Sequence, residues 1–253
     1  MFGLKKRRRR KLLDTPAPPE WEPVLRRNVP YYRRLPEEDR RRLHGLMQVF
    51  LAEKRFEGCG GLALTDEVRV TIAAQACVLI LNREHDYYPL LDSILVYPEA
   101  YVTDERIEEE GGFVSEDDEE RTGESWSQGA LVLSWDDVVV DPDPHDAWNV
   151  VFHEFAHQLA DETGSEDGVP ILPDRERQAA WAEVIGREYD VLARAVERGR
   201  HTFLDEYGAE DPGEFFAVVT EYFFEKSAQL KIRHPDLYEQ LRLFYNQDPV
   251  KLK

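Results

Sequence analysis

The chain has 253 residues, and its 42% hydrophobic content suffices for one large buried core and excludes a protein that is mainly disordered. Acids outnumber bases by 51 to 32, and the net charge of −19 argues against nucleic acid as a partner, because phosphate binding needs a basic surface. The two cysteines, Cys59 and Cys77, are too few for a disulfide scaffold or a cysteine metal cluster, and they fit a cytoplasmic protein.

Residues 1–29 are predicted to form a flexible tail. Residues 5–11 are all Lys or Arg, and a proline-rich stretch follows at 15–19. The basic run could contact an anionic membrane or nucleic acid, and a solvated tail is the simpler interpretation. No apolar stretch follows it, so we expect no secretory signal. The best apolar run, 72–81, is too short for stable membrane insertion, which needs roughly 20 residues.

The remaining residues, 30–253, are expected to form a single domain. Apolar residues at helical spacing predict helices over 37–54 and over 65–81, the second with Asp66 or Thr65 near its start. Residues 93–97 predict a strand.

An acid-rich segment separates this strand from the next. Its acids, spread over 104–124 with Gly111 and Gly112 among them, predict a mobile, solvated loop. Residues 130–133 then predict a strand, and 138–140 continue the apolar pattern. The 130–133 strand is either an ordinary core strand or an edge strand that pairs with a peptide substrate.

The motif HEFAH, at 153–157, is the most informative part of the chain. A helix advances about 100° per residue, so His153 and His157 lie on one face and can bind the same metal ion. Zinc accepts such nitrogens, and Glu154 can act as a base toward a water molecule on the metal. We expect this helix to be capped by Asp143, with Pro144 in its first turn, and to stop at Gly164.

A third ligand is expected from a second apolar helix that begins near Asp211. Glu214, Glu221 and Glu225 share one face of this helix, at spacings of seven and four. Glu214 is the leading candidate for the metal. It also lies three residues after the expected cap, where a glutamate can complete a capping box, and the two roles compete for one carboxylate.

Two further helices are predicted over 178–198 and 235–245. Helices therefore dominate the second half of the chain, while the strands precede the motif helix. This order predicts an α+β fold, with a small mixed sheet packed against helices and the metal site between the motif helix and the Glu214 helix.

Five segments resemble the MtfA family, the Mlc titration factor A zinc metallopeptidases, over a region that runs from about residue 30 to the end of the chain. They are FEGCGGL (56–62), GESWS (123–127), VLSWDD (132–137), HEFAH (153–157) and EFFAV (214–218). The last is also similar to the third-ligand helix of the anthrax lethal factor metalloprotease. The resemblance implies a zincin-like (gluzincin) core in which His153, His157 and Glu214 bind zinc and Glu154 is the base.

The resemblance also implies that Tyr207 faces the open site, whereas the residues alone predict a packed or surface tyrosine before the turn at Gly208. Glu221 and Asp161 are the candidates for hydrogen bonds that orient the ligating histidines. In the family an aspartate often occupies the position that Ala160 has in this chain. The aspartate of this chain, Asp161, lies one position later.

Together these features predict a cytoplasmic zinc peptidase with one zinc per chain, acting on short peptides like an aminopeptidase. The resemblance further implies a regulatory link to Mlc, the repressor of the glucose phosphotransferase genes. One alternative is a non-catalytic zinc-containing binding protein that sequesters a transcription regulator. Another is a zinc hydrolase of esters or amides other than peptides.

Overall fold

The computed structural model describes residues 2–99, 101–102, 120–121, 123–126, 129–140, 147–163 and 170–252. It has the predicted α+β composition, with many helices and a small sheet. The helices are α1 (Phe2–Leu13), α2 (Trp21–Asn28), α3 (Pro30–Arg34), α4 (Glu37–Glu53), α5 (Asp66–Leu79), α6 (Trp135–Val138), α7 (Val150–Ala160), α8 (Arg175–Glu197), α9 (Pro212–Glu225), α10 (Ser227–Arg233) and α11 (Pro235–Tyr245). Short 3-10 turns are η1 (Asp161–Thr163), η2 (Glu206–Ala209) and η3 (Pro249–Lys251).

The main sheet has the strand order β1-β2-β6-β5, formed by β1 (Arg55–Gly58), β2 (Ser93–Tyr97), β6 (Ala130–Ser134) and β5 (Gly123–Trp126). β1, β2 and β6 are parallel, and β5 is antiparallel to β6. A separate pair is formed by β3 (Tyr101–Val102) and β4 (Glu120–Arg121). The described strands thus make a mixed sheet, as predicted.

The proposal that the 130–133 strand forms a sheet edge was wrong. β6 lies inside the sheet, with β2 on one side and β5 on the other. Its central residues Leu131, Val132 and Leu133 are at most 1% exposed, as in an ordinary core strand. The edge on this side is β5, whose first two residues fall in the acid-rich segment 104–124 that was predicted to be a loop.

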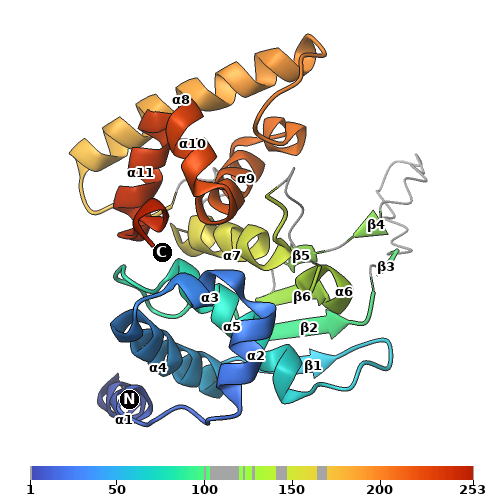
Figure 1. Cartoon of the computed structure of the whole chain (residues 1–253), viewed down its shortest axis with the longest axis vertical. Coiled ribbons are helices and arrows are strands. Elements are labelled where there is room, and N and C mark those ends of the chain that lie inside the picture. Colours follow the sequence, from blue (N-terminus) through green and yellow to red (C-terminus); the bar gives the residue numbers. More distant parts are fainter. Residues whose placement is uncertain are drawn as a thin grey trace.

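Helix α7 lies in the middle of the molecule, between the sheet with its N-terminal helices and the C-terminal helices α8–α11 (Figure 1). Aromatic side chains join it to both halves. The centre of the Phe155 ring lies 4.8 Å from that of Tyr88 and 5.8 Å from that of Phe50, both in the N-terminal half. The Phe152 ring lies 5.1 Å from that of Phe224 in α9. The motif helix is therefore a buried central element.

The start of α7 differs from the prediction. Its N-cap is Asn149, whose Oδ1 accepts the Phe152 N–H at 3.0 Å, so the expected cap Asp143 was wrong. Asp143, Pro144 and the expected stop at Gly164 lie outside the described residues. An asparagine side chain caps a helix as well as an aspartate does, and at this position it also reaches α9.

The apolar residues 138–140 do not form a strand. Trp135–Val138 form the short helix α6, because the Ser134 hydroxyl caps it by accepting the Asp137 N–H at 3.4 Å. Acidic residues in its first turn, Asp136 and Asp137, also favour a helix start.

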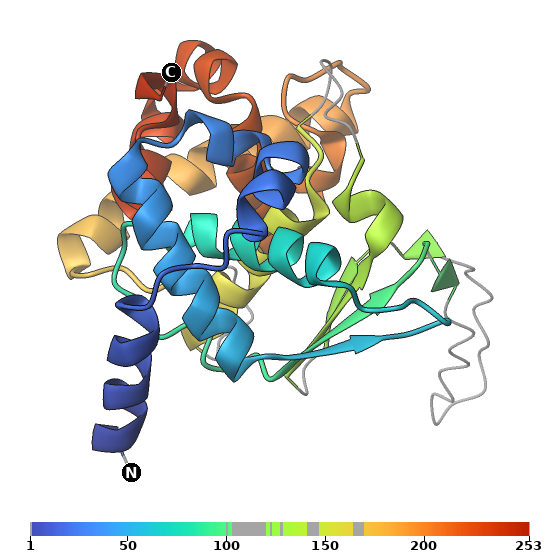
Figure 2. The same ribbon diagram turned by 60° about the horizontal axis from the view of Figure 1, so that its bottom comes forward.

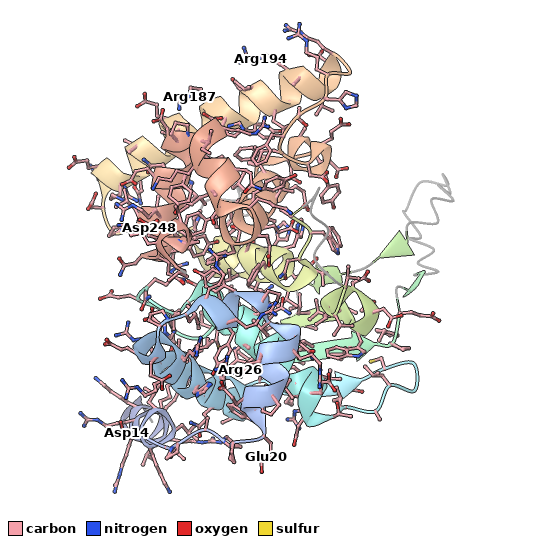
Figure 3. The ribbon with its side chains drawn as sticks, viewed as in Figure 1. Asp14, Glu20, Arg26, Arg187, Arg194 and Asp248 are labelled. Carbon is pink, nitrogen blue, oxygen red and sulfur yellow. The ribbon has the colours of Figure 1, made fainter. Side chains whose placement is uncertain are left out.

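The other predicted elements are confirmed to within three residues of their expected bounds, and two of them, β2 and α11, match these bounds fully. The confirmed elements are α4, α5, β2, α8 and α11. Thr65 caps α5 as expected, accepting the Val68 N–H at 3.3 Å. The charged side chain of Arg194 projects from the outer side of the long helix α8 (Figure 3), while Arg187 pairs with Asp236 at the start of α11. The helix therefore covers the core with its other face, where Trp181 is 2% exposed.

The predicted flexible tail differs from the structure, which has helices over most of this segment. Arg9 of α1 makes two hydrogen bonds of 2.7 Å to the Glu53 carboxylate, and its guanidinium lies 4.5 Å from the centre of the Tyr87 ring. Leu25 of α2 is fully buried. Figure 2 shows α1 projecting from the body with the N-terminus at its far end. Ion pairs and one buried leucine thus supply contacts that composition alone did not indicate.

Most of the acidic segment 104–124 lies outside the described residues. Within the ranges that the structure describes, no helix combines the length and the apolarity that a membrane crossing requires.

Candidate metal centre

Two helices bring the donor atoms together. α7 carries His153 and His157 one turn apart, and α9 presents Glu214 from its own first turn. The α9 cap is Asp211, whose Oδ1 accepts the N–H groups of Gly213 at 2.6 Å and Glu214 at 3.0 Å. The Glu214 carboxylate is instead turned toward the histidines, so the structure favours the ligand role over the capping box.

The three side chains form a compact donor set. His153 Nε2 lies 3.0 Å from Glu214 Oε2, His157 Nε2 lies 3.4 Å from Glu214 Oε1, and the two Nε2 atoms are 3.3 Å apart. Two ligands of one tetrahedral zinc lie about 3.3 Å apart, given bonds of roughly 2 Å. In the part of the chain that the structure describes, this is the one group of three such residues that could hold a metal ion. Its nitrogen and oxygen donors suit zinc.

Glu221 fixes the orientation of the first histidine. Its Oε1 accepts a hydrogen bond from His153 Nδ1 at 2.8 Å, so His153 presents Nε2 to the donor set. Its Oε2 accepts the Asn149 backbone N–H at 2.6 Å. Asn149 in turn donates from Nδ2 to Glu225 Oε1 at 3.0 Å. The three glutamates of α9 therefore all face α7, as their spacing predicted.

His153 and Glu214 each shift the pKa of the other. Burial would lower the pKa of His153, but its hydrogen bonds to Glu214 and Glu221 raise that pKa to about 10. Burial would raise the pKa of Glu214, but hydrogen bonds to the two histidines lower it to about 2. When no metal is bound, a protonated His153 therefore balances the negative charge of the Glu214 carboxylate.

Glu154 lies on the same helix turn and is 6% exposed. Burial raises its pKa above the ordinary value, and the adjacent histidines oppose that rise. A buried carboxylate with a raised pKa is suited to accept and return a proton.

Tyr207 of η2 lies beside this group. Its ring centre is 5.9 Å from that of His153, and 45% of the residue is exposed. Burial of the other part raises the pKa of its hydroxyl, which therefore stays protonated and able to donate.

Trp148, which directly precedes the cap residue Asn149, is a second aromatic neighbour of His153. It is 41% exposed, and its ring centre lies 6.3 Å from that of His153. A pocket of about 160 Å³ opens between these aromatic residues. It is lined by Ala147, Trp148, Asp205, Tyr207, Val218, Glu221 and Tyr222.

Asp161 is the C-cap residue of α7, and its backbone N–H donates to the carbonyl of His157. A hydrogen bond from its side chain to a ligating histidine stays a prediction. Asn149 could have been suspected from the sequence as a helix cap, but its second contact, to Glu225, depends on how α9 packs.

A helix-rich α+β fold with two histidines and a glutamate on adjoining buried helices defines a metallopeptidase type of protein. The family model described as glucose-regulated metallo-peptidase M90 matches residues 4–246, and the chain belongs to this family. It is 43% identical over 245 residues to an uncharacterized protein of Synechocystis, covering 96% of this chain and 89% of that protein.

Relatives called Mlc titration factor A are similar over nearly the same region. The chain is 32% identical to that of Escherichia fergusonii, with 92% of this chain and 87% of the relative covered. It is 33% identical to that of Klebsiella pneumoniae, with 91% and 87% covered. The resemblance found in the sequence is confirmed, and the family supports a function of the metallopeptidase type that involves a metal.

Proposed function

We propose that the chain is a zinc-dependent peptidase with one zinc held by His153, His157 and Glu214 in a zincin-like (gluzincin) core. The observation that carries this proposal is the approach of their donor atoms to within 4.8 Å of one another, beside the buried Glu154. The zinc is part of the proposal, supported by the imidazole and carboxylate donors. We place the enzyme in the cytoplasm, as one domain over residues 30–253.

The chemistry is divided among the residues of the centre. Zinc, when bound, would polarise the scissile carbonyl and acidify a water molecule. Glu154 takes the proton from the attacking water and returns it to the leaving amine. The Tyr207 hydroxyl donates a hydrogen bond to the oxygen on which negative charge develops. Glu221 holds the His153 ring in place through Nδ1.

The substrate is proposed to be a short peptide that is cut in the manner of an aminopeptidase. β5 packs against α7 and has one edge unpaired in the described part of the sheet. Such an edge can bind an extended peptide through its backbone. The pocket of about 160 Å³ beside Trp148 and Tyr207 has room for one side chain of modest size.

The relatives' name, Mlc titration factor A, supports a link to an Mlc-like repressor and through it to expression of the glucose phosphotransferase system. The same name favours the alternative function, a non-catalytic zinc-containing protein that binds and sequesters a transcription regulator.

The experiment that tests catalysis compares the wild type with Glu154→Gln on a library of short peptides. Both proteins are loaded with zinc, and metal content is measured alongside hydrolysis. We expect the variant to keep its zinc and to lose hydrolysis by 100-fold or more, on the order of the contribution of a general base. A wild type that holds zinc and cleaves none of the peptides would favour the binding function. Equal hydrolysis by both proteins would remove Glu154 from the reaction.

A further inference from the structure

A second pocket lies at the opposite edge of the sheet from β5. It has a volume of about 400 Å³, within the range typical of small-molecule sites. It is formed where α4 leads into β1, together with the starts of β2 and α5, and its lining is Lys54, Arg55, Phe56, Glu57, Arg69 and Ser93. None of these residues belongs to the metal centre, so the pocket is a separate site.

Two arginines of the lining lack the partners that arginines usually have in this acid-rich chain. Among the described residues, neither Arg55 nor Arg69 forms an ion pair, whereas Arg9, Arg27 and Arg194 each pair with a carboxylate. The Arg69 guanidinium lies over the Phe56 ring at 5.6 Å from its centre. That ring supports one face of the guanidinium and leaves its N–H groups for a ligand.

Lys54 adds a third positive charge. It is 8% exposed, and its Nζ donates to the backbone carbonyls of Tyr88 and Leu91. Within the described residues no carboxylate lies at ion-pair distance from this ammonium, and burial lowers its pKa to about 8. Two backbone carbonyls hold this ammonium, and Glu53 and Asp92 favour its charged form without forming an ion pair with it, so the charged contacts offered to a ligand are chiefly those of Arg55 and Arg69.

The remaining polar groups define what else the ligand carries. Ser93 offers a hydroxyl that can donate to an oxyanion, and Glu57 offers a carboxylate that accepts from hydroxyl groups. Because the Glu57 carboxylate repels an anion, the anionic group of the ligand must bind near the arginines and away from Glu57.

We propose that this pocket binds a small metabolite through a phosphate or carboxylate group, with Arg55 and Arg69 as its charged contacts. Arginine is suited to both groups because its planar fork makes two parallel hydrogen bonds to either. The inference is independent of the peptidase function, since it involves no residue of the metal centre.

The test is calorimetric titration of the zinc-loaded protein at pH 7 with inorganic phosphate in one series and succinate in another. The test variant is Arg55→Gln/Arg69→Gln. The matched control is Arg33→Gln/Arg41→Gln, which removes the same charge from exposed positions in α3 and α4 that make no ion pair in the described structure. The thermal midpoint of each protein checks that it is folded.

We expect at least one probe to bind the wild type, with affinity weakened about tenfold or more in the test variant and by less than about twofold in the control. The probe that binds assigns the ligand as a phosphate or a carboxylate. Binding that survives in the folded test variant, as it would if the anion sat on the metal, overturns the proposal. So does the failure of both probes to bind the wild type, or equal weakening in both variants.

Discussion

Glu214 occupies the first turn of α9, where a glutamate ordinarily helps to cap its own helix. Because Asp211 alone satisfies the N–H groups of Gly213 and Glu214, the Glu214 carboxylate can turn toward His153 and His157. The Asp211 cap, three positions earlier, thus leaves the Glu214 side chain of α9 available to contact the histidines of α7.

Replacing Glu214 by Ala removes one of the three donors of the proposed site. We expect zinc, measured by elemental analysis after dialysis, to fall from near one per chain to a small fraction of that value. The matched control is Glu210→Ala, an exposed acid close by in sequence, which should keep its zinc. Unchanged stoichiometry in Glu214→Ala would exclude this residue as a ligand.

Lys54 makes folding depend on pH in a defined window. Burial lowers its pKa from the ordinary value of 10.5 to about 8. Between these pH values the unfolded chain binds a proton that the folded protein has released, so the Lys54 contribution to the free energy of unfolding increases as pH rises. We expect Lys54→Met to show a smaller increase than the wild type between pH 7.5 and 9.5.

Urea unfolding at the two pH values measures this difference, because both proteins share every other titrating group. The same pH dependence in wild type and variant would show that Lys54 titrates normally in the folded protein.

The individual site residues differed in how far they could be predicted. His153, Glu154 and His157 follow from a local pattern, because a helix fixes their relative positions. Glu221 followed from its spacing to Glu214. Asn149 and Trp148 did not, because their roles depend on where α7 begins and on contacts with α9 and η2.

At the scale of elements, the N-terminus of α7 is tied to α9 by a single asparagine. The Asn149 side chain caps α7 with its oxygen and donates its amide to the partly buried Glu225 carboxylate. The backbone of the same residue donates to Glu221, which orients His153. Helix capping and ligand orientation therefore share one residue.

Asn149→Ala should lower the free energy of unfolding by about 2 kcal/mol, roughly 1 from the lost cap and the rest from the hydrogen bond lost by the partly buried Glu225 carboxylate. The comparison is Asp174→Ala, which removes the exposed cap of α8 and should cost about 1 kcal/mol. Denaturant unfolding of both variants gives the two values. Equal losses would mean that the bond to Glu225 contributes nothing.

The elements that the sequence predicted well are those with long, regular periodicity, such as α4, α5 and α8. The errors were at short elements. Residues 138–140 have strand-like side chains, but the Ser134 cap directs the chain into α6. The edge position of β5 could not be predicted, because strand order depends on pairing between distant segments.

At the scale of the whole molecule, α1 is joined to the body by Leu12, which packs against the core, and by charged side chains, among which Arg9 has the most partners. This side chain pairs with Glu53 and Asp86 and covers the Tyr87 ring. The other bases of residues 5–11 remain largely exposed around it.

Arg9→Ala should make α1 more accessible to trypsin, with cleavage within residues 5–11 roughly fivefold faster, since the helix opens more readily without these contacts. Arg7→Ala is the control, because it also removes one cleavage site and Arg7 makes no contact to the body in the described structure. The cleavage rate is followed by mass spectrometry of the released peptides. Similar rates in both variants would show that Arg9 does not hold α1.

The position of α7 between the two halves of the molecule has a consequence for biosynthesis. One side of α7 packs on segments that are synthesised before it. The other side, which includes Phe152, packs on Phe224 of α9, which is synthesised later. Asn149 and Glu221, which join the same two helices, are 72 positions apart. At about 5 to 20 residues per second, a ribosome needs about 4 to 14 seconds to add that length. During that interval the apolar side of α7 that faces α9 is not yet covered by the chain itself. We expect chaperones or the ribosome to cover it until α9 has been made.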